Sequence, residues 1–173
     1  MISINEQFTQ IYDDCYRMVY RYFFYKTGGK ELSEDLTAET FLKAYTNFSH
    51  FDDKKASVQT WLMTLAKNIY IDNFRKHKNQ IYVSDELLTE TPDTTDFEKE
   101  ILSADTYKIL YKAMSYLGDN EKNLIALKYS AELKNKEIAV IIGKSERHTA
   151  VMLGRIITKL KKTLIKMGVD SYE

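Results

Sequence analysis

The stretch from Ser57 to Lys78 reads SVQTWLMTLAKNIYIDNFRKHK and predicts a single helix with two different faces. At helical spacing, one side collects enough apolar residues to seat the helix in a core: Val58, Trp61, Leu62, Leu65, Ala66 and Ile69. The opposite side interleaves rings and cations: Met63, Lys67, Tyr70, Phe74 and Lys78, with Arg75 and Lys76 nearby. Cations neutralise phosphates and flat rings stack on unpaired bases, so this second face suits a nucleic-acid strand. The alternative is a core helix whose cationic end only complements the helix dipole.

Charge is distributed unevenly around this helix, although the 173-residue chain carries 25 basic and 25 acidic side chains. Residues 60–80 hold four basic and one acidic side chain, and residues 144–166 hold seven basic and one acidic. Between them, residues 84–106 hold one basic and eight acidic side chains. Two positive segments therefore flank an acidic one, and such local fields govern association with an anionic partner more than net charge does.

The chain lacks the signals of a secreted, membrane-spanning or metal-binding protein. Its one cysteine, Cys15, cannot form an internal disulfide, and no apolar run is long enough for a signal peptide or a membrane span. His50, His77 and His148 are scattered without partners at metal-ligand spacing. We therefore expect a reduced, cytoplasmic protein with no membrane insertion, no metal and no cofactor. Cys15 lies at helical spacing with apolar neighbours, which predicts a packed thiol and not a nucleophile.

Two helices are predicted before residue 57. Apolar and aromatic residues keep a 3.6-residue period from Asn5 to Lys26, and Gly28 and Gly29 end that helix. Ser33 is predicted to cap a second helix that turns inward Leu36, Thr40, Phe41 and Ala44. Residues 47–57, NFSHFDDKKAS, break the pattern and predict a loop that carries Phe51, Lys54 and Lys55.

Residues 81–106 contain the only proline, Pro92, among clustered Asp, Glu and Thr, and predict an acidic linker. Asp119 is predicted to cap a helix that carries Leu124, Ile125, Leu127 and Tyr129. A helix-turn-helix is predicted next, from KEIAVII at 136–142, a turn at Gly143, and a basic helix with one apolar side formed by Thr149, Leu153, Ile156, Leu160 and Leu164. We expect an all-α protein with two small helical domains, residues 1–80 and 107–173, joined by this linker.

Two parts of the chain resemble bacterial sigma factors of the extracytoplasmic-function group. The run SEDLTAETFLKAYTNFSHFD from Ser33, followed by TWLMTLAKNIYIDNFRKHK from Thr60, is similar to their second conserved region. The run LGDNEKNLIALKYSAELKNKEIAVIIGKSERH from Leu117 is similar to their fourth region, whose helix-turn-helix usually carries the triplet found here at Glu137, Ile138 and Ala139. Together the two matches cover most of the chain in the order typical of the family.

The resemblance implies a non-enzymatic, dissociable specificity subunit of RNA polymerase that recognises promoter DNA and melts its minus-ten element. It implies docking on the clamp helices of the largest core polymerase subunit and on the flap of the second-largest. It also implies an anti-sigma factor that holds the protein inactive. By analogy, the polymerase-binding residues are Asp35, Leu36, Glu39, Thr40 and Phe41. Core packing is the simpler interpretation for at least one of Leu36 and Phe41.

The resemblance places Phe51 in the base-capturing loop of the family. Extracting a base costs on the order of a few kcal/mol of stacking, and an aromatic ring returns about 1–3 kcal/mol per base. Asn68 offers a donor and an acceptor to a base edge. The predicted minus-ten and melting residues are Phe51, Lys54, Lys55, Lys67, Asn68, Tyr70, Phe74, Arg75, Lys76 and Lys78. The alternative for Phe51 is a ring that only covers the apolar face of the central helix.

The second helix of the helix-turn-helix departs from the family pattern. Relatives usually carry basic side chains where this chain has Ala150, Met152, Gly154 and Ile157. Apolar side chains forgo bidentate hydrogen bonds that discriminate by about 1–3 kcal/mol each. We therefore expect weak or unusual reading of the upstream minus-thirty-five element, with phosphate contacts from Lys159, Lys161 and Lys162. The predicted residues at that element are Ser145, Arg147, His148, Val151, Met152, Arg155 and Lys159.

Two other functions compete with that of a sigma factor. A sigma-like helix-turn-helix regulator or accessory factor would bind DNA without selecting promoters alone, and the altered second helix is compatible with it. A nuclease or another enzyme would need a carboxylate cluster, a histidine pair or metal-ligand spacing, which the sequence lacks.

Overall fold

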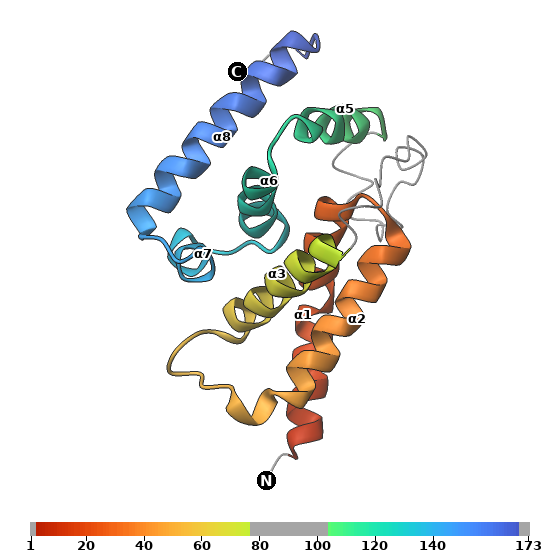
Figure 1. The fold of residues 1–173 in the computed structure, drawn as a ribbon, viewed down its shortest axis with the longest axis vertical. Helices are drawn as coiled ribbons and strands as arrows, with labels where there is room; N and C mark the ends of the chain where they lie inside the picture. Colours follow the sequence, from red (N-terminus) through yellow and green to blue (C-terminus); the bar gives the residue numbers. More distant parts are fainter. Residues whose placement is uncertain (1–2, 77–103, 170–173) are drawn as a thin grey trace.

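The computed structural model describes residues 3–76 and 104–169, which form two packed helical units (Figure 1). The N-terminal unit comprises α1 (Ile4–Thr27), α2 (Lys30–Thr46), the short 3-10 helix η1 (Phe48–His50) and α3 (Val58–Lys76). The C-terminal unit comprises α5 (Ala104–Ser115), α6 (Asp119–Ile125), the π-helical turn η3 (Ala126–Ser130), α7 (Asn135–Ile142) and α8 (Glu146–Lys166). The described residues contain no strand, which confirms the all-α prediction. Most of the predicted linker lies outside the described residues, and its last three residues belong to α5.

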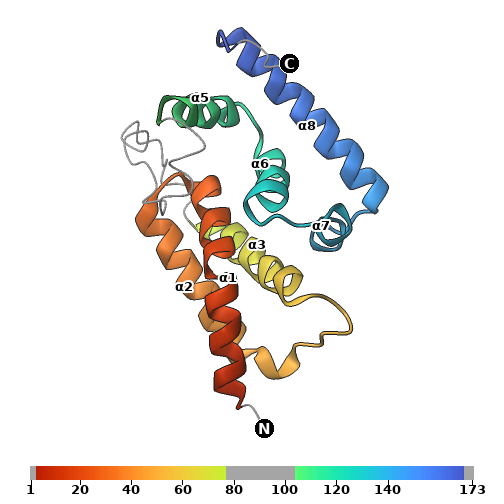
Figure 2. The ribbon, with the colours of Figure 1, turned by 180° about the vertical axis from the view of Figure 1, so that it is seen from behind.

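The arrangement of the helices places α3 at the centre of the molecule. In Figure 1, α1 and α2 form an antiparallel pair, and α3 lies between this pair and the C-terminal unit. The view from behind in Figure 2 shows α8 on the far side, with α6 and α7 between it and the N-terminal unit. Within the described ranges, none of the helices is both long and apolar enough to cross a membrane.

Helix α1 has local signals at both ends. At its start, the Ser3 hydroxyl accepts the Glu6 N–H at 3.2 Å while the Glu6 carboxylate accepts the Ser3 N–H at 2.7 Å, which forms a capping box. At its end, Gly28 has φ 72° and its N–H donates to the Phe24 carbonyl at 2.8 Å. This left-handed backbone conformation favours glycine, and a Cβ added at residue 28 would also meet the end of the Tyr111 side chain of α5.

Helix α2 begins earlier than the sequence predicts. It starts at Lys30 after Gly29, and Ser33 lies inside the first turns with its side chain fully buried. The Ser33 hydroxyl donates to the Gly29 carbonyl and lies 2.8 Å from the Thr27 hydroxyl, so it does not cap the helix. Thr37 and Thr40 bond in the same way, since their buried hydroxyls also donate to the backbone carbonyls four residues earlier. A short connection through two glycines leaves no room for the predicted cap.

The buried side of α3 is wider than its periodicity predicts. Leu62, Ala66 and Ile69 are buried as expected, but Met63, assigned to the outer face, is also fully buried. The reason is that α3 contacts three neighbours, with α1 and α2 on one side and α7 on another. The pattern on one helix predicts the side that meets one neighbour, whereas α3 also contacts α7, a helix far along the chain.

The C-terminal unit confirms the predicted helix-turn-helix. Gly143 has φ 66° and ends α7, and the Ser145 hydroxyl accepts the His148 N–H at 3.2 Å at the start of α8. The predicted apolar side of α8 faces the core, with Thr149, Leu153 and Ile156 buried and Leu160 and Leu164 half-buried.

The predicted cap of α6 is wrong. The residue before the helix is Gly118, whose N–H donates to the Glu121 carboxylate at 2.8 Å, and Asp119 is already helical. Of the residues predicted on this helix, Leu124 and Ile125 lie on α6, and Leu127 and Tyr129 lie on the π-helical turn η3, where Tyr129 is 53% exposed.

The two units share one continuous hydrophobic core. Helix α1 contacts α6 and η3, while α3 contacts α7. Polar contacts reinforce this packing: the Tyr22 hydroxyl donates to the Asn123 side chain at 2.6 Å, and Lys26 donates to the Asp119 carbonyl at 3.1 Å. The N-terminal and C-terminal units therefore form one packed body around α3.

Replacing Met63 by alanine tests the second burial of α3. We expect Met63→Ala to lower the free energy of unfolding by about 2–5 kcal/mol, since it removes a fully buried side chain. Leu42→Ala is the control, because Leu42 is 66% exposed on α2 and its loss should change stability by no more than about 0.5 kcal/mol. Urea unfolding of both variants measures the difference, and equal values would contradict the described packing of α3.

Candidate nucleic-acid interface

The C-terminal half of α3 presents rings and cations together at the surface. Phe74 is 48% exposed, and its ring stacks on Tyr70 with centroids 6.2 Å apart and planes 16° apart. Arg75 and Lys76 in the last turn are exposed, as is Asn68 two turns earlier. Lys78 lies outside the described residues. This end of α3 therefore offers a stacking surface beside two exposed cationic side chains, which suits a single strand.

The loop before α3 holds Phe51 against the helix. The Phe51 ring is half-buried, with its centroid 4.9 Å from that of Trp61 and 6.1 Å from that of Phe48. This is the covering arrangement that the sequence left open as an alternative. Lys54 and Lys55 beside it are exposed, and Lys55 lies 3.5 Å from the Asp52 carboxylate. The loop thus combines a partly accessible ring with two surface cations.

Two predicted strand-binding residues are engaged by the protein itself. Lys67 donates to the Ile141 carbonyl of α7 at 2.9 Å, across 74 residues of sequence. The Lys26 ammonium lies 4.1 Å from the centre of the Tyr70 ring, a cation–π contact. Burial raises the pKa of Tyr70 to about 12 and lowers the pKa of Lys26 to about 8. Lys26 was missed by the sequence analysis, since nothing in α1 signals a partner on α3.

Helix α8 exposes most of the residues predicted to read the upstream element. The exposed side chains are Ser145, Arg147, His148, Val151, Arg155 and Lys159. Met152 is half-buried and packs against the core, so it is less available to a base than predicted. The atypical residues Ala150 and Gly154 are exposed. The surface of α8 therefore offers two arginines and one histidine next to small or apolar side chains.

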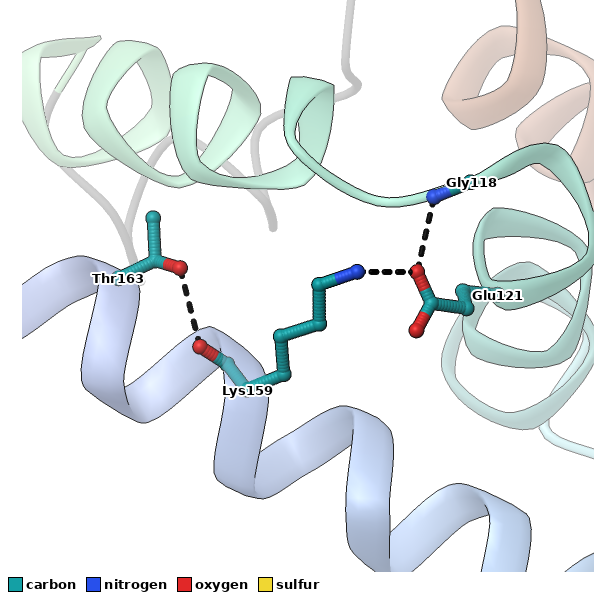
Figure 3. Close-up of polar contacts among 4 residues, drawn as sticks. All are labelled: Gly118, Glu121, Lys159 and Thr163. Atoms are coloured by element: carbon teal, nitrogen blue, oxygen red, sulfur yellow. Dashed lines mark hydrogen bonds and ion pairs between the residues drawn. The ribbon is translucent and has the colours of Figure 1, made fainter.

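Lys159 makes an ion pair within the protein, although the sequence assigned it to DNA phosphates. Its ammonium lies 2.6 Å from the Glu121 carboxylate, and the same carboxylate oxygen accepts the Gly118 N–H (Figure 3). Thr163 donates to the Lys159 carbonyl at 3.0 Å one turn later. The hydrogen bonds from Lys159 and Gly118 hold the pKa of Glu121 below its usual value. Lys159 therefore joins α8 to the start of α6.

The predicted polymerase-binding residues divide into two groups on α2. Asp35 and Glu39 are exposed. Leu36, Thr40 and Phe41 are at most 4% exposed, and the Phe41 ring packs edge-on against Phe8 and Tyr12 of α1. The buried side chains hold α2 on α1, so only the two carboxylates of this set are accessible at the surface.

The described residues contain no cluster of three or more histidine, cysteine, aspartate or glutamate side chains that could hold a metal ion. Cys15 is only 2% exposed, and burial raises the pKa of its thiol to about 11. A thiol in this state is almost entirely protonated at neutral pH, so it behaves as a packed apolar group.

Comparison with known proteins gives a consistent set of similarities. The family described as sigma-70 region 2 matches residues 11–80. The chain is 34% identical over 166 residues to the ECF RNA polymerase sigma factor SigM of Bacillus subtilis (strain 168), covering 91% of this chain and 97% of that protein. It is 31% identical over 143 residues to SigW, another such factor of the same strain, covering 78% and 72% of the two chains. Its fold resembles that of the sigma factor RpoE from Bartonella quintana, solved in complex with the anti-sigma factor NepR, with a TM-score of 0.74, 19% identity, and coverage of 92% and 97%.

Two glycines near the helix-turn-helix should respond oppositely to substitution. Gly154 lies inside α8, and a Cβ added there would meet open space, so Gly154→Ala should raise the free energy of unfolding by about 0.5–1 kcal/mol. A Cβ at Gly143 would also meet open space, but this residue has φ 66°, which strains any residue with a Cβ. Gly143→Ala should therefore lower the free energy of unfolding by about 1–2 kcal/mol. Urea unfolding of the two variants measures both signs. Destabilisation by Gly154→Ala would show that this glycine has a packing role.

The Lys159–Glu121 ion pair should contribute stability in a defined pH range. Glu121→Gln should lower the free energy of unfolding at pH 7 by about 0.2–1 kcal/mol, since both side chains are partly exposed. Because the folded-state pKa of Glu121 is depressed, this contribution is present above its ordinary value of 4.5 and is lost as the pH falls through the folded-state pKa. Urea unfolding between pH 7 and pH 3 should show the wild type and the variant converging. Glu31→Gln, at an exposed carboxylate in the first turn of α2, is the control.

Proposed function

The chain belongs to the extracytoplasmic-function RNA polymerase sigma factors, which act in transcription initiation, and we propose that it binds core polymerase and melts promoter DNA along α3. The observation that carries this proposal is the exposed end of α3, where Phe74, Arg75 and Lys76 combine a stacking ring with two cations. Rings hold unpaired bases without regard to sequence, and cations hold the strand backbone. Asn68 adds a side chain able to donate and accept at a base edge.

We assign the capture of an extracted base to the loop at residues 51–55. Phe51 is half-exposed and backed by Trp61, so a base could stack on its outer side while the inner side stays packed. Lys54 and Lys55 beside it would hold the neighbouring phosphates. Rigid backing by Trp61 favours capture, because a ring already fixed in position loses little conformational freedom when a base binds.

Core polymerase binding is assigned to the exposed acidic face of α2. Asp35 and Glu39 lie one turn apart on this face, and Leu42 and Tyr45 continue it with 66% and 47% exposure. This face, with carboxylates beside exposed apolar side chains, would bind clamp helices of the largest core subunit that present cations to it. Docking of the C-terminal unit on the flap of the second-largest subunit completes the proposed holoenzyme.

Reading of the minus-thirty-five element is assigned to Arg147, His148 and Arg155 of α8. Met152 packs on the core, which leaves fewer side chains for base edges than the sequence predicted, and Lys159, predicted to contact phosphates, is paired with Glu121. We propose that upstream discrimination is weak and that promoter choice depends more on the melted strand.

An anti-sigma factor is the proposed regulator, which is supported by the complex of the structurally similar RpoE with NepR.

Removing the two cations at the end of α3 tests strand binding. With core polymerase and a promoter duplex, Arg75→Ala combined with Lys76→Ala should reduce strand opening, measured by permanganate reactivity of unpaired thymines. The slope of log affinity against log salt for a single strand should fall by about 1.4, since each lost phosphate contact removes about 0.7. Lys108→Ala with Lys112→Ala, at exposed lysines on α5, removes the same charge as a control. If both pairs changed strand opening equally, α3 would not be the strand-binding surface.

A further inference from the structure

The connection between α2 and α3 carries a second aromatic ring beside Phe51. Figure 1 shows this connection looping out beyond the start of α3. It begins with η1, after which the Phe51 N–H donates to the Phe48 carbonyl at 3.0 Å. Side chains three residues apart eclipse one another in a 3-10 turn, so the turn brings the two rings to the same side. Their centroids are 6.1 Å apart and their planes differ by 11°, which makes them a stacked pair.

Phe48 is itself held in place by the two preceding helices. The Phe8 ring of α1 meets the Phe48 ring edge-on, with centroids 5.5 Å apart and planes 74° apart. Phe8 is only 8% exposed and belongs to the hydrophobic core, against which the half-buried Phe48 packs. The backbone before the turn is fixed as well, since the Asn47 N–H and side-chain amide both donate to the Lys43 carbonyl of α2. Phe48 therefore has a defined position relative to α1 and α2.

Trp61 and Phe48 constrain the Phe51 ring in different ways. The Trp61 ring lies nearer, with its centroid 4.9 Å from that of Phe51, but its plane is tilted by 36°. The Phe48 ring is almost parallel to Phe51. Contact with Trp61 thus limits how far Phe51 moves toward α3, whereas the parallel contact with Phe48 sets the tilt of the Phe51 plane. This tilt matters because a base that stacks on a ring must lie nearly parallel to it.

We propose that Phe48 is a positioning residue for base capture, because its ring holds the Phe51 ring in the plane on which an extracted base stacks. The inference rests on the proposed function, which assigns base capture to Phe51. Phe48 acts through Phe51 and does not itself bind the base. A ring that is already fixed loses little conformational freedom when the base arrives, whereas a mobile ring loses that freedom at the expense of affinity.

The test compares strands with and without a base at each position of the opened promoter region. Holoenzyme assembled from the full chain and core polymerase is titrated with fluorescent single strands from the opened region of a promoter, and anisotropy measures their affinity. Each strand of the series carries one abasic site, at a different position. In the wild type, the captured base is the one whose removal weakens binding, and Phe51→Ala should abolish that loss.

We expect Phe48→Leu to reduce the affinity ratio between the intact strand and the strand abasic at that position by about threefold to tenfold. This factor corresponds to the cost of immobilising one side chain on binding. Phe48→Tyr keeps a ring and should retain the wild-type ratio. Phe24→Leu is the matched control, because it makes the same change at a ring that is 3% exposed and contacts Tyr20 on α1. Phe48→Met, which also lacks a ring, repeats the test if Phe48→Leu folds poorly.

The salt dependence of binding distinguishes positioning from a general disruption of the loop. Phe48→Leu removes no phosphate contact, so the slope of log affinity against log salt should keep its wild-type value. A collapsed loop would displace the exposed cations Lys54 and Lys55 and lower that slope. A lower slope, or equal weakening of intact and abasic strands, would make Phe48 a purely structural residue and overturn the inference.

The Phe51 variant separates this inference from the proposed function. If Phe51→Ala abolishes the difference between intact and abasic strands while Phe48→Leu leaves it at the wild-type value, positioning by Phe48 is overturned and base capture by Phe51 stands. If Phe51→Ala changes the ratio at no position, base capture by Phe51 fails and the inference fails with it.

Discussion

The burial of α3 on two sides is the constraint on which the rest of the structure depends. Leu62, Met63 and Ala66 are fully buried, which requires α1 and α2 on one side and the C-terminal unit on another. The side chains that α3 leaves exposed are Gln59 in its first turn and, in its C-terminal half, Asn68, Asp72, Phe74, Arg75 and Lys76. Because hydrophobic burial is non-directional and proportional to area, a second apolar neighbour stabilises α3 as effectively as the first. The exposure of each candidate binding residue on α3 follows from which side of this helix each neighbour covers.

Three lysines illustrate how this packing redistributes charge. Lys67, Lys26 and Lys159 each lie within hydrogen-bonding distance of an acceptor on a distant element: the end of α7, the start of α6, and Glu121. The Ile141 carbonyl lies in the last turn of α7, where unsatisfied carbonyls concentrate partial negative charge. The Asp119 carbonyl and the Glu121 carboxylate both belong to the first turn of α6. These three lysines therefore stabilise the association of helices that are distant in the sequence.

The two proposed DNA-binding surfaces differ in what they offer. The end of α3 combines a stacked ring pair with cations, which suits an unpaired strand of any sequence. Helix α8 offers Arg147 and Arg155 for base edges, separated by Ala150, Val151 and Gly154. Discrimination by hydrogen bonds requires side chains that fork onto a base, and α8 has few of them. This difference is consistent with a factor that gains more of its specificity from the opened strand than from the upstream duplex.

The sequence by itself determined the helices, several of their ends and the class of the protein, because these features depend on residues within one or two turns of each other. Local pattern and spacing predict the helix ends at Gly28 and Gly143, the cap at Ser145 and the apolar side of α8. The motifs around Ser33, Thr60 and Glu137 likewise indicated the sigma-factor family. Only the tertiary structure decided which functional side chains are free. Helix α3 is covered on a second side by α7, which begins at Asn135, and Lys67 bonds a carbonyl 74 residues away. Such partners share no periodicity with the residues they cover, since they are brought together by packing of whole units and not by the turn of one helix.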